Sequence, residues 1–278
     1  MRMSTGKPLR RAVLVITLFG LVIGTLLFWR QSRGLEAETP RQVSTAQQPP
    51  SAPQRQPVAR GGARVGASPA DIQMRVLSAR EVLSGDQRQM ALSREEASWM
   101  RRHGYPTAAE MDSLDTLETG PLRGTRDPQL ATLHGMALAR RNELMPAMTV
   151  LDGAAALGST FAYEEAAIAE YRLVRERFGP SIDSDDVLRA RLEVARILGD
   201  YKVDYLIERY LPNYPLRGRA SIVQAHTTTF LRKLGEETQL RGVPPRGPDP
   251  RPNSEAWLKL RAEAAADSSR TVEVFFLE

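Results

Sequence analysis

An uncharged apolar run near the amino end constrains this chain more than any other feature. Residues 12–29 read AVLVITLFGLVIGTLLFW, which is 18 residues without a charged side chain. As a helix the run is about 27 Å long, close to the thickness of a hydrocarbon core. Lipid offers no hydrogen bonds to an open backbone, so the run predicts a helix that spans a membrane.

Flanking charges predict the orientation of this helix. The basic tail, residues 1–11, holds Arg2, Lys7, Arg10 and Arg11 and no acid. Because cations resist translocation, we expect the tail to stay in the cytoplasm and the rest of the chain to be exported. A cleaved signal peptide is the first alternative, although its apolar stretch is shorter and a small-residue cleavage site follows it. A buried helix of a globular domain is the second, and it does not need the flanking cations.

Two glycines in this run, Gly20 and Gly24, form a G-x-x-x-G pattern. Small residues at this spacing let two membrane helices approach closely, so the pair is a candidate transmembrane dimer contact. Glycine is also common in membrane helices in general, and on that interpretation the pair makes no contact.

Residues 30–70 are rich in proline and glutamine and contain no apolar run. Such a composition buries too little surface to fold, and it predicts a disordered linker. Residues 1–70 contribute a net charge of +8, so the remainder sums to −3 against a formal total of +5. The part expected to fold is therefore slightly acidic. This disfavours nucleic acid as a partner, because that function needs a basic patch on a folded domain.

From residue 71 onward, helical periodicity and helix-start signals dominate. Capping boxes that pair Ser93 with Glu96 and Thr107 with Glu110 predict two short helices joined by a turn. Asp127 before a proline predicts another helix start. Further helices are expected from the spacing of apolar residues at about 71–82, 145–158, 161–178, 184–198, 201–211, 219–234 and 254–267. The first of these would begin at Asp71 and the fourth at Ser184.

These elements predict an α-helical domain over residues 71–240. Residues 241–278 are expected to hold a Pro-rich loop, a C-terminal helix and an apolar tail, TVEVFFLE, that is β-prone and docks on the domain. The predicted fold class is all-α. It consists of a single N-terminal transmembrane helix, a flexible linker and a domain of helical hairpins that resembles an α-solenoid.

Residues 127–170 resemble a known helical repeat. The positions that carry the resemblance are Asp127, Pro128, Leu133, Gly135, Leu151, Ala154, Ala155, Gly158, Ser159 and Ala162. The pattern is similar to the Sel-one-like branch of the tetratricopeptide family, although the step of 32 residues from Leu130 to Ala162 is short for it. The resemblance implies a fragment of an α-solenoid whose usual role is to hold other proteins. A plain bundle with Ala-rich contacts explains the same pattern.

No residue set predicts a catalytic centre, a cofactor site or a metal site. The three histidines, His103, His134 and His226, lie far apart and none has a metal-ligand spacing to another. Cysteine is absent, which excludes disulfides, thiolate metal sites and a cysteine nucleophile. The acidic cluster at 183–186 lacks the glycine and distal glutamate of a calcium loop, and helix capping explains it. We therefore do not expect an enzyme.

The most aromatic stretch holds Tyr201, Tyr205, Tyr210 and Tyr214. Tyrosine is favoured at interfaces because its ring is apolar and its hydroxyl forms hydrogen bonds. These four residues are candidate partner-binding residues. Packing in the core is the alternative role for the same side chains.

Together these features predict a membrane-anchored scaffold or adaptor whose exported domain binds or positions other envelope proteins. The 34 arginines against four lysines suggest a bacterial chain, so the expected places are the inner membrane and the periplasm. A membrane-anchored enzyme or activator that acts on the cell wall is one alternative, and an accessory subunit of a secretion or division complex is another. The expected partners are the lipid bilayer, an unknown protein and a second copy of the chain.

Overall fold

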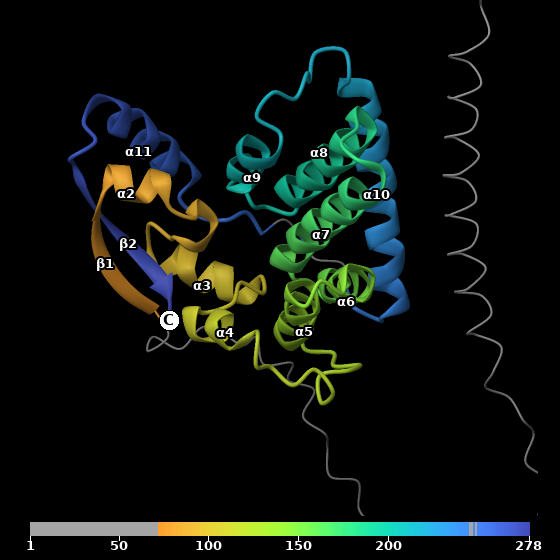
Figure 1. Ribbon diagram of the computed structural model, residues 1–278. Coiled ribbons are helices and arrows are strands. Elements are labelled where there is room, and N and C mark those ends of the chain that lie inside the picture. The colour runs from red at the N-terminus through yellow and green to blue at the C-terminus, as the bar shows by residue number, and fades with distance from the viewer. Residues whose placement is uncertain (1–71, 245–246, 248) are drawn as a thin grey trace, which may run out of the picture. The chain divides into compact units, whose positions relative to one another are not determined.

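Helices make up most of the part of the chain that the structure describes, together with one small sheet. The computed structural model describes residues 72–244, 247 and 249–278. In chain order the elements are β1 (Ile72–Ser78), α2 (Ala79–Ser84), the 3-10 helix η3 (Gln87–Gln89), α3 (Arg94–Arg102), α4 (Ala108–Ser113), α5 (Pro128–Arg140), α6 (Leu144–Ala156), α7 (Thr160–Phe178), α8 (Ile182–Ile197), α9 (Val203–Tyr210), α10 (Ala220–Leu240), α11 (Ser254–Ala266) and β2 (Thr271–Leu277) (Figure 1).

Side-chain caps explain where several helices begin. The Thr107 hydroxyl accepts a hydrogen bond from Glu110 N and the Glu110 carboxylate accepts one from Thr107 N, which confirms that predicted capping box. Asp127 caps α5 as predicted. The start of α8 is corrected, because Ser181 caps this helix and Ser184 lies inside it.

The two strands come from the two ends of the described region. β1 and β2 pair antiparallel, and Ile72 lies opposite Leu277. Val274 of β2 is buried in a cluster with Trp257 of α11 and residues of α2. Ala91 forms an isolated bridge to β2. The C-terminal segment is thus part of the core of the domain, and the prediction that TVEVFFLE docks on it is confirmed.

The mostly helical structure is consistent with the predicted all-α class, but the helix predicted at residues 71–82 is wrong over residues 72–78. We expected a helix that begins at Asp71, but these residues form β1, and the helix α2 begins after Ser78, whose side chain caps it. In the sequence IQMRVLS apolar and polar side chains largely alternate, which suits a strand. A short helix is marginal without tertiary packing, and pairing with the β-prone end of the chain supplies that packing to the strand.

The transmembrane part of the predicted fold class is also corrected. Within the residues that the structure describes, no helix combines the length and the apolarity that crossing a bilayer requires. Of the two longest, α7 carries charged side chains along its length, and α10 carries them in its second half. The segment predicted to span, residues 12–29 with Gly20 and Gly24, lies outside the described residues, as does the predicted linker at 30–70.

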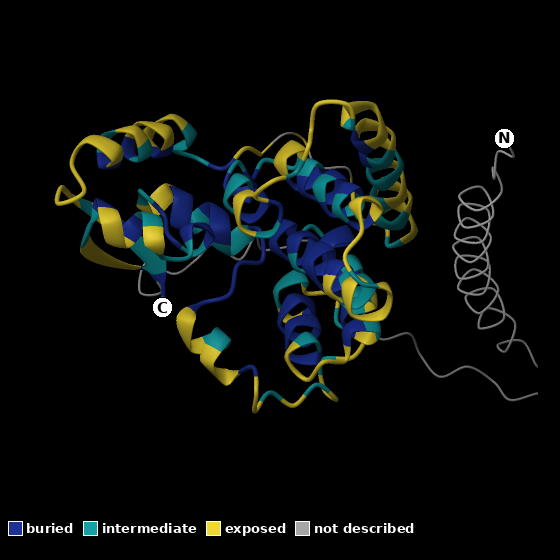
Figure 2. Cartoon of the chain, turned by 45° about the horizontal axis from the view of Figure 1, so that its top comes forward, coloured by how far each residue is buried: buried dark blue, intermediate teal, exposed yellow. Residues whose placement is uncertain are grey.

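One apolar core joins the sheet to the helices. Its buried members include Trp99, Met100, Tyr105, Leu114, Leu133, Leu151, Phe161 and Leu277. Helices α5 to α8 pack consecutively, each on the next, and α10 lies against α6 and α8. Figure 2 shows buried residues in dark blue where elements meet and exposed residues in yellow on their outer sides. This core holds α3, α5 and α7 in the positions that form the candidate site.

The crossing of α5 and α6 depends on a glycine. A Cβ atom on Gly135 would lie 2.5 Å from Cγ of the buried Leu151, so a larger residue collides with that side chain. Close approach of helices at small residues is what the resemblance to the Sel-one-like family implies here. The family assignment itself stays a prediction.

Candidate functional site: a buried charge network beside an amphipathic cavity

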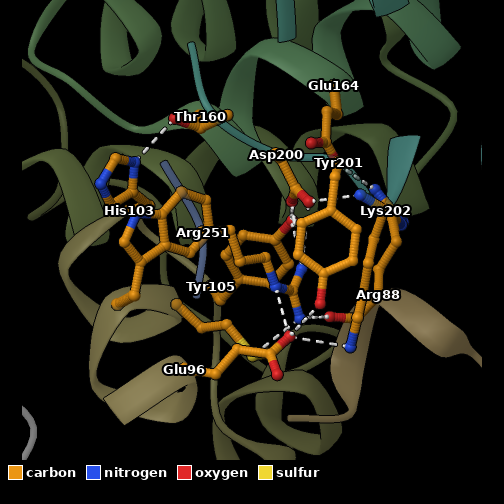
Figure 3. A network of polar contacts seen from close by, with 12 residues as sticks. Arg88, Glu96, His103, Tyr105, Thr160, Glu164, Asp200, Tyr201, Lys202 and Arg251 are labelled. Carbon is orange, nitrogen blue, oxygen red and sulfur yellow. Dashed lines mark hydrogen bonds and ion pairs between the residues drawn. The ribbon is translucent and has the colours of Figure 1, made fainter. Parts of the chain in front are cut away.

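Charged side chains from distant segments meet in the interior. Those of Glu96, Asp200, Lys202 and Arg251 are fully buried, at 0% exposure. Tyr105 donates its hydroxyl to Asp200. Because an isolated charge is costly away from water, these groups depend on one another. Figure 3 shows how they converge.

Arg251 is the centre of this network. Its Nε lies 2.7 Å from Glu96 Oε1, and its Nη1 lies 3.1 Å from Asp200 Oδ2. Its Nη2 donates to the backbone carbonyls of Arg88, at 2.9 Å, and of Met90, at 3.1 Å. The planar guanidinium therefore ties the segment before α11 to α3, to the loop before α9 and to the residues around η3.

Glu96 accepts hydrogen bonds from several directions. Its Oε2 accepts from Leu92 N at 2.7 Å, so only half of the predicted capping box forms, in which Ser93 Oγ accepts from Glu96 N at 3.1 Å. Its Oε1 is shared between Arg251 and Lys202. Burial alone raises the pKa of Glu96, but these two cations together with the hydrogen bond from Leu92 N hold that pKa below its usual value.

Lys202 competes with Arg251 for the same carboxylate oxygen. Its Nζ lies 2.9 Å from Glu96 Oε1 and 4.1 Å from the centre of the Trp257 ring, and it donates to Met90 O. Burial, and next the charge of Arg251, lower the pKa of Lys202 to about 7. Since a guanidinium stays protonated, the lysine amine is the cation that loses its proton near neutral pH.

A second group of charges connects the network to α7. Arg88 Nη1 lies 2.9 Å from Glu164 Oε2, and Arg88 Nη2 lies 2.9 Å from Glu165 Oε1. The Arg88 guanidinium also lies 5.1 Å from the centre of the Phe161 ring. Burial, and next the charge of Asp200, raise the pKa of Glu164 well above its usual value. Arg88 is the residue that belongs both to the network and to the cavity described next.

A cavity of about 350 Å³ opens beside Arg88, between η3, α4, α5, α7 and the end of β2. Its apolar lining residues are Ala108, Met111, Met136, Ala139, Phe161, Phe276 and Leu277. Its polar lining residues are Asp86, Arg88, Gln89, Arg140, Glu165 and Arg172. This combination makes the cavity amphipathic.

A smaller cavity, of about 80 Å³, adjoins the network at Lys202. Lys202, Trp257, Tyr201 and Tyr205 are among the residues that line it. A volume of this size has room for only a few water molecules. It is therefore a poor candidate for a ligand site.

His103 forms a chain of contacts that resembles a catalytic triad. Its Nδ1 lies 2.8 Å from Thr160 Oγ1 and its Nε2 lies 3.0 Å from Asp249 Oδ2, while its ring stacks on Trp99 at 3.9 Å. However, His103 and Thr160 are each only 4% exposed, and neither cavity is lined by any of these residues. A substrate has no approach to the hydroxyl, so we assign this chain of contacts a structural role.

The four predicted tyrosines fall into two clusters. Tyr201 donates its hydroxyl to Glu96 Oε1 at 3.2 Å and packs with α11. Tyr205, Tyr210 and Tyr214 pack at the edge of the cluster formed by α7, α8 and α9. All four are half-buried, and their partner-binding role stays a prediction.

Neither metal chemistry nor similarity to known proteins adds to this description. Among the described residues, no group of three or more His, Asp or Glu side chains is arranged to hold a metal ion. Comparison of the chain with protein-family models, with curated proteins and with solved structures finds no match.

Sequence reasoning missed both the network and the cavity. Arg251 is 51 residues from Asp200 and 155 from Glu96, and it lies in a segment that reads only as a Pro-rich loop. The one local signal was the capping box at Glu96. It suggested a helix start and gave no sign that the carboxylate has distant partners.

Proposed function

We propose that the described domain binds or positions another protein by holding a segment of that protein in the 350 Å³ cavity. The observation that carries this proposal is the lining, in which seven apolar residues stand beside five charged ones in one concave site. Ligand sites in proteins are typically concave and mostly apolar, with a few polar groups that fix the orientation of the ligand.

The two sides of the cavity differ in how firmly they are held. Phe161 and Met136 are buried in the core, and Arg88 is fixed by two carboxylates. By contrast, α4 supplies Ala108 and Met111 to the cavity and buries none of its six residues. A firm floor with a lightly packed side suits a site that must admit a side chain from outside.

The lining favours binding over catalysis. It includes no Ser, Thr, His, Tyr or Lys, and both of its acids lie near Arg88, with Asp86 at 3.9 Å and Glu165 at 2.9 Å. Nucleophilic and acid–base chemistry need such a group free to face the substrate. The alternative of an enzyme acting on the cell wall gains no support at this cavity.

Site-specific photocross-linking in cells tests the proposal. A small diazirine amino acid, photo-leucine, placed at Ala139 keeps most of the cavity open and is expected to cross-link a discrete partner protein, because Ala139 lines the cavity. The same group at Thr228, an exposed residue of α10 outside the lining, is expected to give no such product. The readout is the cross-linked band and its identity by mass spectrometry.

A pair of substitutions on α4 supplies the matched control. Ala108→Trp fills the cavity from its rim and should abolish the cross-link from position 139, because Ala108 lines the cavity. Ala109→Trp adds the same side chain at the exposed neighbour that does not line it, and should leave the cross-link intact. Identical products from positions 139 and 228, or no product from either, would refute the proposal.

A further inference from the structure

The apolar part of the cavity suits one or two large side chains. Two methionines and two phenylalanines line it, Met111, Met136, Phe161 and Phe276. Methionine is unbranched and adapts to different shapes, while aromatic rings offer large contact areas. The volume of about 350 Å³ lies at the lower end of the range of ligand sites, roughly 300–1,000 Å³. A short group therefore fits better than an extended ligand.

Cationic charge at the rim is incompletely paired. Arg172 is exposed on α7 and, within the residues that the structure describes, it forms no ion pair or hydrogen bond. Arg140 lies 3.1 Å from Asp115, but the two side chains are 41% and 69% exposed. An ion pair exposed to this extent is weak, so Arg140 is available to a better partner.

Arg88, at the floor, has a donor without an acceptor. Its side chain is 8% exposed, and its two terminal nitrogens pair with Glu164 and Glu165. Its Nε is buried and, among the described residues, has no hydrogen-bond partner, since Asp86 Oδ1 lies 3.9 Å away. A buried donor left unpaired is unfavourable, and an acceptor brought in by a ligand would relieve it.

From these observations we infer the chemistry of the occupant: a segment of a partner protein in which a large apolar side chain stands next to an Asp or Glu. The inference rests on the proposed function of the cavity. The apolar side chain packs among the methionines and phenylalanines, and the carboxylate lies among the arginines of the lining. Arginine is suited to this role because its planar fork matches a carboxylate with two parallel hydrogen bonds.

Titration calorimetry of the full chain with two small peptides tests this chemistry. The peptides are N-acetylated, C-amidated Leu-Phe-Glu and Leu-Phe-Gln, which differ only in the charge of the last side chain. We expect the acidic peptide to bind about tenfold more tightly, as one charge-assisted hydrogen bond would give. With Arg172→Glu this preference should disappear, and Leu-Phe-Lys should become the best of the three.

The matched control is Arg177→Glu, an exposed position of the same helix that does not line the cavity. It makes the same change in net charge and should keep the preference for the acidic peptide. Loss of the preference in both variants, or equal affinity of the two peptides for the unmodified chain, would overturn the inference. So would tighter binding of octanoate than of either peptide, because that result would identify an amphiphile as the ligand.

The peptide titration and the cross-linking experiment distinguish a failure of this inference from a failure of the proposed function. If neither peptide binds while position 139 still cross-links a partner and Ala108→Trp abolishes the product, the cavity binds a protein of different chemistry and only the inference falls. If Arg172→Glu does not fold, the comparison of the two peptides on the unmodified chain still decides.

Discussion

Glu96 is shared by two buried cations that differ in what else they can bond. The guanidinium of Arg251 pairs with Glu96 and Asp200 and donates hydrogen bonds to two backbone carbonyls. The ammonium of Lys202 pairs with Glu96, donates to Met90 O and lies over the ring of Trp257. Arg251 therefore holds its charge firmly. Lys202 is buried with a lowered pKa, so the protonation of its amine contributes to the pH dependence of folding.

Replacing Lys202 should change how stability depends on pH. The pKa of Lys202 is about 7 in the folded chain, below the value of about 10.4 for an unperturbed lysine. Between these values the unfolded chain binds more protons, so the free energy of unfolding rises with pH, by up to about 1.4 kcal/mol per unit. In Lys202→Met this contribution is absent. The unfolding free energy of the unmodified chain minus that of Lys202→Met should therefore increase from pH 7.5 to 9, measured by denaturant titration.

The control for this experiment is Lys259→Met, whose side chain is 76% exposed in the native protein. Its stability should follow that of the unmodified chain across the same pH range. If the pH dependence of Lys202→Met runs parallel to that of the unmodified chain, the amine does not titrate near neutral pH in the folded state. The measurement stays below pH 10 because burial raises the pKa of Tyr105 and of Tyr201, and these groups act in the opposite sense above that pH.

Among the secondary-structure elements, the contacts of α5 with α6 and of β1 with β2 illustrate two kinds of specificity. Gly135 lets α5 approach Leu151 of α6, so one missing side chain sets the crossing. The sheet instead depends on a register between segments about 200 residues apart. Helix starts could be predicted from sequence because a cap such as Thr107 with Glu110 is complete within four residues. Strand β1 could not, because its partner lies at the other end of the domain.

Two glycine-to-alanine substitutions should have opposite effects on stability. In a helix this change is ordinarily favourable by roughly 1 kcal/mol. Gly135→Ala should instead lower the free energy of unfolding by about 1–3 kcal/mol, because the new methyl group collides with buried Leu151. Gly235→Ala, in α10, meets nothing within 4 Å and should stabilise the chain. Thermal and chemical unfolding followed by circular dichroism give both values.

A double variant checks the cause. If the collision destabilises Gly135→Ala, combining it with Leu151→Ala should cost less than the sum of the two single changes. Simple additivity of the two changes would show that the α5–α6 contact does not explain the loss of stability.

In the molecule as a whole, the ion pairs and hydrogen bonds of Arg251 connect the C-terminal segment to the rest of the core. Arg251 bonds residues near η3, in α3 and before α9, while β2 and α11 pack on β1 and α2. The helical content of residues 79–240 follows from local patterns of caps and apolar spacing, and sequence analysis recovers most of it. The cavity could not be predicted, because it exists only where five elements meet, and no local pattern encodes a meeting of that kind.

Arg251→Met should destabilise the domain strongly. The substitution leaves Glu96 and Asp200 buried without the cation that pairs with both, and breaking a buried pair from one side costs about 3–5 kcal/mol. Arg232→Met removes an exposed pair, with side chains 62% and 55% exposed, and should cost less than about 1 kcal/mol. Equal losses in the two variants, measured by denaturant titration, would contradict the central role of Arg251.

Because β1 pairs with β2, the first strand stays unpaired during most of the synthesis of the domain. Because the two strands lie about 200 residues apart, β1 leaves the ribosome roughly 10–40 s before its partner exists, at translation rates of ~5–20 residues per second. During that interval the apolar side chains of the first strand have no native neighbour from the second. Nascent chains should accordingly be most prone to aggregation or chaperone binding after the helices have emerged and before β2 has emerged.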